Sequence, residues 1–134
     1  AREGLAKQLK EAHWFEDYDK ALQIAKATNR SVLLDFTGSD WCGWCIRLDN
    51  EIFKTDDFKK YAGNKLVLVK LDFPRNKPQD EEIKKQNQRL AQEYQIRGYP
   101  TLVILDARGK KSGTMGYVQG GPEPFLKQLD GIVR

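Results

Sequence analysis

Three short, unbroken apolar runs are the feature that most constrains how this chain can fold. They occupy residues 32–34, 66–69 and 102–105. Each run is continuously apolar rather than alternating, which is typical of strands covered on both faces. The stretches between the runs carry apolar residues at helical spacing, such as Leu48 and Ile52 in the first and Leu90 and Tyr94 in the second. Strands that alternate with helices predict an α/β fold with a central, partly parallel sheet between helices.

The two ends of the chain complete this pattern. We expect residues 1–17 to form a polar N-terminal extension with a weak helix and a short edge strand, and residues 18–134 to form one domain. Asp17, and likewise Thr55 and Asp80 farther along the chain, is positioned to cap the helix that follows it. After the third apolar run, residues 106–109 predict a hairpin turn leading into a strand that ends at Tyr117, and a last helix follows.

The composition excludes several classes of protein. The chain has 134 residues, of which 40% are apolar, enough for one domain with its own core. The net charge is +4, from 23 basic and 19 acidic residues, and this small excess gives no reason to expect nucleic acid as a partner. No apolar run approaches the length of a membrane span. The first residues carry no signal-peptide core, so we expect either a cytosolic protein or one whose export signal has been removed.

Cys42 and Cys45, the two cysteines of the chain, follow the first apolar run and open a helix. The unpaired N–H groups and the positive dipole end of a helix N-terminus favour a thiolate at Cys42. Cys45 lies almost one helical turn further on, within bonding reach of the Cys42 sulfur. Cys42 can therefore attack a substrate disulfide and Cys45 can resolve the mixed disulfide. We expect Cys42 to be the exposed thiol and Cys45 the buried one.

Other interpretations of the pair are weaker. A purely structural disulfide would close a very small loop, where the entropic gain is least. A zinc site usually needs four ligands from Cys and His, and the chain offers two cysteines and one histidine, His13. Inert buried thiols are the third alternative. Redox chemistry is favoured over all three, with no metal and no cofactor beyond the cysteine pair.

Two motifs carry a resemblance to a known family. Residues 35–45, with Asp35 and the sequence WCGWC, resemble the active-site segment of thioredoxins, and RGYPT at 97–101 resembles their cis-proline loop. The chain from roughly residue 18 onward thus resembles the thioredoxin superfamily. Residues 36–45 are similar to exported bacterial thioredoxin-like proteins, the periplasmic DsbH-type oxidoreductases. The resemblance implies a thioredoxin fold with a mixed central sheet, and a periplasmic or otherwise exported protein, with a cytoplasmic one as the alternative.

The resemblance also implies roles for particular residues. Cys42 matches the attacking and Cys45 the resolving cysteine. Asp35 matches the buried acid that takes the proton of the resolving thiol, and Lys70 the lysine that pairs with this acid. Burial would raise the pKa of Asp35 and Lys70 would lower it. A satisfied strand-end acid is the simpler alternative for Asp35.

Five further residues are implied to bind substrate. Pro100 matches the proline whose preceding peptide bond is cis, which would place the Tyr99 backbone beside the thiols as an edge for an extended substrate chain. Trp41 matches the tryptophan that borders the site. Gly43 and Trp44 lie between the two cysteines, and Trp44 is either a platform for substrate or part of the local packing.

The chain departs from typical thioredoxins in four places. Asp35 lies one position farther from Cys42, so one residue is inserted in between. Trp44 replaces the proline between the cysteines, and Asn50 stands where the following helix has a kinking proline. The segment between the second and third apolar runs is longer, and the extra length includes residues 74–80. The loop at 73–79 is expected to be solvated.

These observations favour an enzyme, a thiol–disulfide oxidoreductase that acts on protein disulfides. A reductase is the favoured direction, because the DsbH-type resemblance indicates it. The main alternative is a peptide-binding or chaperone module of the same fold with incidental redox activity, and a heme- or metal-delivery thioredoxin is a third. We expect a monomer whose partners are protein thiols or disulfides and an upstream electron donor or acceptor.

Overall fold

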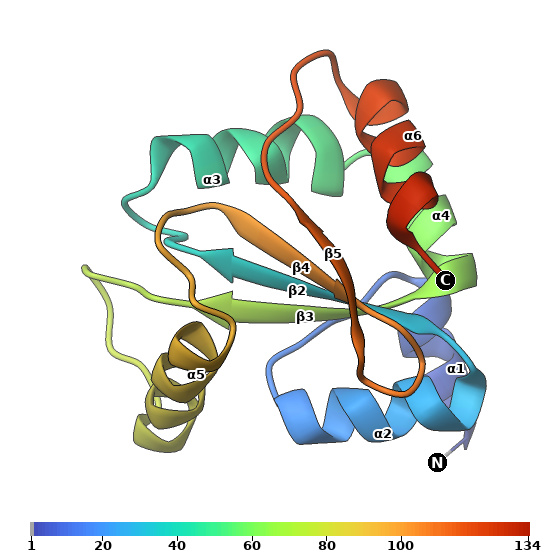
Figure 1. The fold of residues 1–134 in the computed structure, drawn as a ribbon, viewed down its shortest axis with the longest axis horizontal. Helices are drawn as coiled ribbons and strands as arrows, with labels where there is room; N and C mark the ends of the chain where they lie inside the picture. Colours follow the sequence, from blue (N-terminus) through green and yellow to red (C-terminus); the bar gives the residue numbers. More distant parts are fainter. Residues whose placement is uncertain (1) are drawn as a thin grey trace.

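Five strands form one sheet in the order β1-β3-β2-β4-β5 in the computed structural model, which describes residues 2–134 (Figure 1). The β1–β3 and β2–β3 pairs are parallel, whereas β2–β4 and β4–β5 are antiparallel. The sheet is therefore mixed, as the family resemblance implies. The strands are β1 (Trp14–Phe15), β2 (Ser31–Thr37), β3 (Leu66–Asp72), β4 (Thr101–Leu105) and β5 (Lys111–Met115).

The three central strands are the three apolar runs. Leu33 of β2 is in register with Leu68 of β3 and Ile104 of β4, and all three side chains are buried in one core. The next residue along β2, Leu34, is buried in the core on the opposite face with its β3 neighbour Val69. Both faces of these strands are covered, which explains why the runs are continuously apolar.

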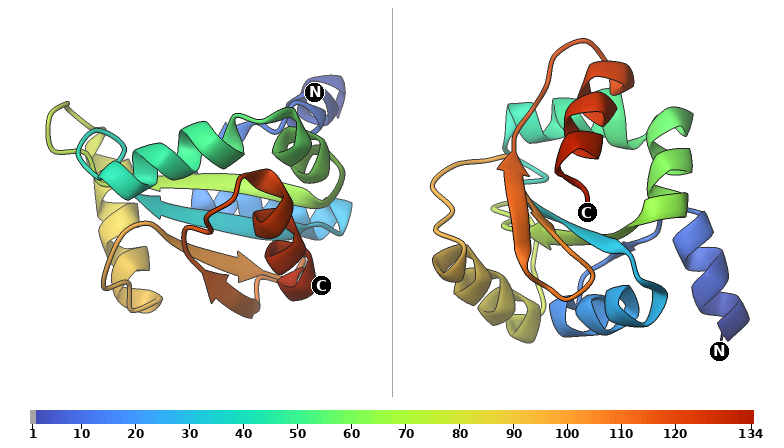
Figure 2. Two further views of the ribbon diagram at one scale, coloured as in Figure 1. Left: turned by 90° about the horizontal axis from the view of Figure 1, so that it is seen from above. Right: turned by 45° about the vertical axis from the view of Figure 1, so that its right-hand side comes forward.

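Helices α3, α4 and α6 cover one face of the sheet, and α2 and α5 cover the other (Figures 1 and 2). The expected helix caps form: Asp17, Thr55 and Asp80 each accept a hydrogen bond from a backbone N–H of the first turn that follows. The helices are α1 (Arg2–Lys10), α2 (Tyr18–Thr28), α3 (Gly43–Leu48), the π-helical η1 (Asp49–Phe53), α4 (Asp56–Lys65), α5 (Glu81–Glu93) and α6 (Pro122–Ile132). None of the helices in residues 2–134 combines the length and apolarity required to cross a bilayer.

The N-terminal segment is joined to the rest of the fold. Helix α1 lies against α4 at Gly63, where an added Cβ would come 2.5 Å from the backbone oxygen of Lys10. Strand β1 pairs with β3, with Trp14 opposite Leu68. The division of the chain after residue 17 stays a prediction, but the expected edge strand is part of the sheet.

Two elements differ from what the sequence suggests. The helix after the cysteines changes at Asp49 from α to π geometry, so that one widened turn lies where thioredoxins have a proline kink. The last strand ends at Met115 rather than at Tyr117. Tyr117 lies beyond the strand, and its hydroxyl donates a hydrogen bond to Glu51 of η1.

Candidate active site

The two cysteines lie where β2 ends and α3 begins, and they form a disulfide with a Cα–Cα distance of 5.2 Å. Cys42 is the N-cap of α3, and its Sγ accepts a hydrogen bond of 3.2 Å from the backbone N–H of Cys45. The backbone N–H of Cys42 in turn donates to the oxygen of Gly38 at 2.9 Å. The sulfur of Cys42 thus lies at the end of the helix where N–H groups favour negative charge.

The expected difference in exposure between the cysteines is wrong for this disulfide form. Cys42 is 6% exposed and Cys45 is 4% exposed, so both are buried. The bond holds the Cys42 sulfur against Cys45 rather than toward solvent. What distinguishes the two is position, because Cys42 occupies the helix N-cap and Cys45 the first turn.

An aromatic cluster borders the disulfide on the side of the proline loop. The Tyr99–Pro100 peptide bond is cis. The Tyr99 ring meets the Trp41 ring edge-on, with 5.7 Å between centroids, and lies 5.3 Å from the Phe73 ring. The indole N–H of Trp41 donates to the backbone oxygen of Phe73 at 2.7 Å, which fixes the orientation of the ring.

The other side of the disulfide is more open. Trp44 is 54% exposed, and its ring lies 5.2 Å from that of Tyr117. The Arg47 guanidinium lies 4.9 Å from the centroid of the Trp44 ring and pairs with Glu51 at 2.8 Å. Gly43, which precedes Trp44, has free space where a Cβ would be.

Asp35 lies in β2, directly opposite Lys70 of β3, and its Oδ1 atom is buried with no hydrogen-bond partner in the described structure. Burial raises the pKa of this carboxyl to about 7. Lys70 acts against the increase and the charge of Asp49 adds to it. Proton exchange near neutral pH is the chemistry that such a carboxyl can perform.

A cavity of about 400 Å³ lies on the inner side of the cysteine pair, and Asp35, Cys45, Lys70 and Asp49 all line it. Asp35 therefore faces the same space as the second cysteine despite the residue inserted between them. Asp49 comes from the first position of η1. Sequence reasoning missed Asp49, although its spacing was a signal: it lies four residues after Cys45, and its backbone N–H donates to the Cys45 oxygen as in an ordinary α-helix.

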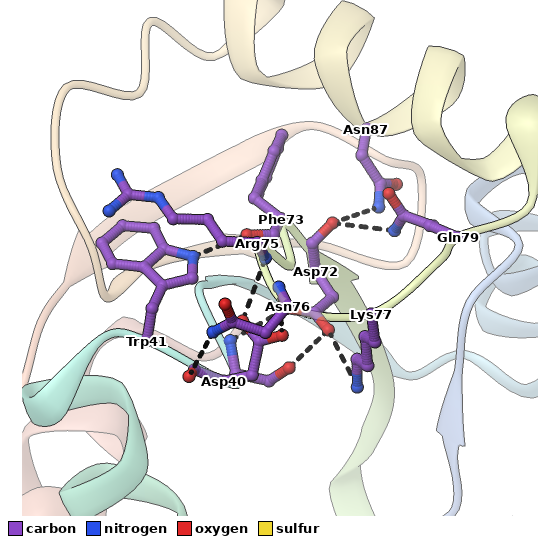
Figure 3. Close-up of polar contacts among 10 residues, drawn as sticks. Asp40, Trp41, Asp72, Phe73, Arg75, Asn76, Lys77, Gln79 and Asn87 are labelled. Atoms are coloured by element: carbon purple, nitrogen blue, oxygen red, sulfur yellow. Dashed lines mark hydrogen bonds and ion pairs between the residues drawn. The ribbon is translucent and has the colours of Figure 1, made fainter.

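The inserted residue is accommodated by a contact that the sequence analysis did not predict. The segment before Cys42 is hydrogen-bonded to the long segment after β3 (Figure 3). The Asp40 carboxylate accepts hydrogen bonds from the backbone N–H groups of Arg75, at 3.0 Å, and Asn76, at 2.9 Å. The Asp72 carboxylate accepts from the Ser39 N–H at 2.9 Å. We name residues 38–41 and 72–76 together the loop clasp.

The long segment is exposed at residues 75–78, as expected of a solvated loop, but its hydrogen bonds to residues 38–41 were not expected. A signal was present in the sequence. The residue inserted before Cys42 and the extra residues at 74–80 each follow the end of an apolar run. In the structure these two ends are neighbours, with Thr37 opposite Asp72. Two insertions at the same edge of a sheet are placed to contact each other.

No group of three or more His, Cys, Asp and Glu side chains among residues 2–134 is arranged to hold a metal ion. The reactive group of the site is the Cys42–Cys45 disulfide, with Tyr99 of the proline loop packed against the neighbouring Trp41 and with Asp35 lining the same cavity as Cys45. A family model described as a thioredoxin-like domain matches residues 18–131. The chain belongs to the thioredoxin-like family.

Individual members of this family give the same result. The disulfide bond reductase DsbH of Chlamydia pneumoniae is 38% identical over 120 residues, which cover 90% of this chain and 72% of that protein. A solved structure of a DsbH oxidoreductase matches with a TM-score of 0.83 and 38% identity, covering 88% of this chain and 82% of the other.

A more distant relative is much longer than this chain. The thiol:disulfide interchange protein DsbD of Vibrio vulnificus (strain CMCP6) is 31% identical over 120 residues. These residues are 87% of this chain but only 18% of DsbD. The thioredoxin-like family and the CxxC disulfide together establish the activity: the protein is a protein-disulfide oxidoreductase of thioredoxin fold.

Proposed function

We propose that this thioredoxin-like protein works as a reductase of protein disulfides. The observation that carries the exchange chemistry is the Cys42–Cys45 disulfide at the start of α3, because such a pair can alternate between disulfide and dithiol. The direction is supported by the DsbH relative, which is a disulfide bond reductase. An upstream thiol donor must then return the pair to the dithiol form.

In the proposed reaction, the Cys42 thiolate attacks one sulfur of the substrate disulfide and the other sulfur leaves as a thiolate. The result is a mixed disulfide between Cys42 and the substrate. Cys45 then loses its proton and attacks the Cys42 sulfur, so that the second substrate thiolate leaves and the Cys42–Cys45 disulfide forms. Two electrons pass to the substrate, and no bound cofactor or metal takes part.

Asp35 is the proposed acceptor of the Cys45 proton. Its carboxyl lines the cavity that Cys45 also lines, and its pKa of about 7 lets it take and release a proton near neutral pH. Lys70 is a supporting residue that stabilises the ionised carboxyl from the neighbouring strand. Solvent in the cavity connects the pair to bulk water.

The substrate is proposed to bind as an extended chain across the disulfide. The backbone of Tyr99, before Pro100, offers it hydrogen-bonding groups, while Trp41 borders the chain on one side. Gly43 permits close approach because nothing occupies the position of a Cβ. Trp44 provides an exposed apolar surface on the far side.

The setting of the protein is also part of the proposal. Similarity to DsbH-type proteins supports an exported or periplasmic location. The partners would be exported proteins with disulfides and a thiol donor of the kind that DsbD, a thiol:disulfide interchange protein, represents. We propose that the protein acts as a monomer.

Direction is tested by the equilibrium reduction potential of the Cys42–Cys45 pair against glutathione. We expect a value of about −230 to −270 mV, between glutaredoxins and thioredoxin. A value near about −120 mV, as for the strong oxidant DsbA, would reverse the proposed direction.

The division of labour is tested with single-cysteine variants. Cys45→Ser should accumulate mixed disulfides with substrate proteins, whereas Cys42→Ser should accumulate few, because only Cys42 is proposed to attack. Equal trapping by both would contradict the assignment. A variant with both cysteines replaced should lose all turnover, and if it still suppressed aggregation of unfolded chains, the peptide-binding function would be favoured instead.

A further inference from the structure

The loop clasp holds a cation beside the active site. The Arg75 guanidinium lies 3.6 Å from the centroid of the Trp41 ring, and Trp41 immediately precedes Cys42. The charge of Arg75 also reaches Tyr99: burial raises the pKa of the Tyr99 hydroxyl, and Arg75 acts against this increase. Arg75 thus lies over Trp41 (Figure 3) and its charge acts on Tyr99, and these two residues border the proposed path of the substrate.

The position of Arg75 is set by its own backbone. The Asp40 carboxylate binds the N–H groups of Arg75 and Asn76, and the Asn76 side chain donates to the backbone oxygen of Asp40 at 3.3 Å. The Asp40 carboxylate therefore binds backbone N–H groups and not the Arg75 guanidinium. These bonds orient the loop so that the Arg75 guanidinium lies over the Trp41 ring, within the distance of a cation–π contact.

Two arginines lie against the two tryptophans of the motif, and they differ in their charge balance. Arg47, over Trp44, is neutralised by Glu51 at 2.8 Å. Arg75 takes part in none of the ion pairs formed among residues 2–134, and it is exposed. Its guanidinium N–H groups remain available to a carboxylate from another molecule.

We propose that Arg75 is a specificity-determining residue that favours protein disulfides with an acidic side chain beside the attacked cysteine. A substrate chain that pairs with the Tyr99 backbone and runs along Trp41 brings its neighbouring side chains close to the Arg75 guanidinium, which lies over the Trp41 ring. A carboxylate there meets an unpaired, pre-oriented cation, whereas a basic side chain meets like charge. Asp40 is the positioning residue for this contact.

The inference rests on the disulfide reduction proposed above, and the test separates the two. The probes are three disulfide-linked peptides that differ only in one residue next to the cysteine: Asp, the isosteric Asn, or Lys. With the reduced protein at low salt, kcat/KM should be roughly three- to fivefold higher for Asp than for Asn, as expected for an exposed ion pair, and lowest for Lys. If no peptide were reduced, the proposed function would fail; if all three were reduced equally, only this inference would.

Variants identify the residue responsible. In Arg75→Gln the Asp-to-Asn ratio should fall to about one, and in Arg75→Glu the order should invert in favour of Lys. Arg108→Gln is the matched control, because Arg108 is exposed in the β4–β5 turn at the opposite end of the sheet and its loss changes the net charge equally. That variant should keep the wild-type ratio, and a ratio that fell there as much as in Arg75→Gln would overturn the proposal.

Two measurements check the mechanism of selection. Asp40→Ala should lower the Asp-to-Asn ratio although Arg75 is still present, and combining it with Arg75→Gln should lower the ratio no further. In the wild type, the ratio should shrink toward one at high salt, because an exposed ion pair is screened. A ratio that does not respond to salt would overturn the proposal without relying on any variant.

Discussion

Two buried aspartates in neighbouring strands differ in whether their carboxylates have hydrogen-bond partners. Asp35 in β2 and Asp72 in β3 are both buried, with 7% and 8% of their surface exposed. Both Asp72 carboxylate oxygens have partners: Oδ1 accepts from the Ser39 N–H and Oδ2 from the Ser39 hydroxyl, with Lys77 at 3.6 Å. The Oδ1 of Asp35 has no partner among the described residues.

The difference separates a structural carboxylate from a reactive one. Hydrogen bonds and a cation compensate the lost hydration of Asp72, so it can tie the loop clasp together (Figure 3). Asp35 has only partial compensation from Lys70, and burial raises its pKa to about 7. An uncompensated buried acid destabilises the fold, and such groups are typical of functional sites.

The largest effect is expected for the stability of Asp35→Asn at high pH. The unfolded carboxyl ionises near its ordinary value of 3.8 and the folded one near 7. Between these values the folded state holds one proton more, so the free energy of unfolding falls as the pH rises. Asp35→Asn removes this loss and should be more stable than the wild type at pH 8, by up to about 4 kcal/mol.

The measurement is urea unfolding of the oxidised protein at pH 4 and pH 8. At pH 4 the folded carboxyl is protonated and the unfolded one is only partly ionised, so the free energies of unfolding of the variant and the wild type should differ by less than about 1 kcal/mol. A stability difference that stayed constant from pH 4 to pH 8 would contradict the account of Asp35 as an uncompensated acid.

The second effect has the opposite sign. Asp72→Asn should lower the free energy of unfolding by about 1–3 kcal/mol at pH 7, because hydrogen bonds to a charged acceptor are weakened and Lys77 loses its partner. The same unfolding experiment measures it, with Asp35→Asn as the matched change in the neighbouring strand. Equal changes in the free energy of unfolding in both variants would mean that the two carboxyls do not differ in their contribution to stability.

The smallest effect is on a reaction rate, and it compares the functional roles of Asp35 and Asp72. Asp35→Asn should slow the resolution of the mixed disulfide roughly tenfold at pH 7, because solvent in the cavity replaces it only in part as proton acceptor. Attack by Cys42 should change much less. Rapid-quench release of the second substrate thiol measures this step, and Asp72→Asn should change it much less, because the charge of Asp72 is the smallest of the causes that raise the pKa of Asp35. Unaltered resolution in Asp35→Asn would make this residue a structural one.

Much of the fold and part of the site could be predicted from local patterns. The apolar runs predicted the central strands, and the caps at Asp17, Thr55 and Asp80 form. The cysteine pair at a helix start was also readable, since it depends on spacing along the chain. The difference in thiol exposure was not, because the disulfide buries both sulfurs.

The loop clasp could not be predicted in the same way. Asp40 and Arg75 lie far apart in the sequence, and nothing local to either indicates that one binds the backbone of the other. Contacts of this kind depend on where the ends of β2 and β3 meet. Asp49 differs from them, because it lies four residues after Cys45 on the same helix face, and its place beside the cavity could have been predicted from that spacing.

The sequence by itself determined the elements and the reactive group: a sheet of apolar strands, helices on both faces, and a CxxC motif at a helix N-terminus. These depend on local spacing and on the amount of apolar surface that must be buried. Only the tertiary structure decided the different roles of the Asp35 and Asp72 carboxyls. The two side chains are identical, but hydration, hydrogen bonds and neighbouring charges depend on the folded surroundings. Folding provides Asp72 with hydrogen-bond donors and a cation, so this carboxylate stabilises the structure. It leaves the Oδ1 of Asp35 without a partner, so this carboxyl can accept a proton.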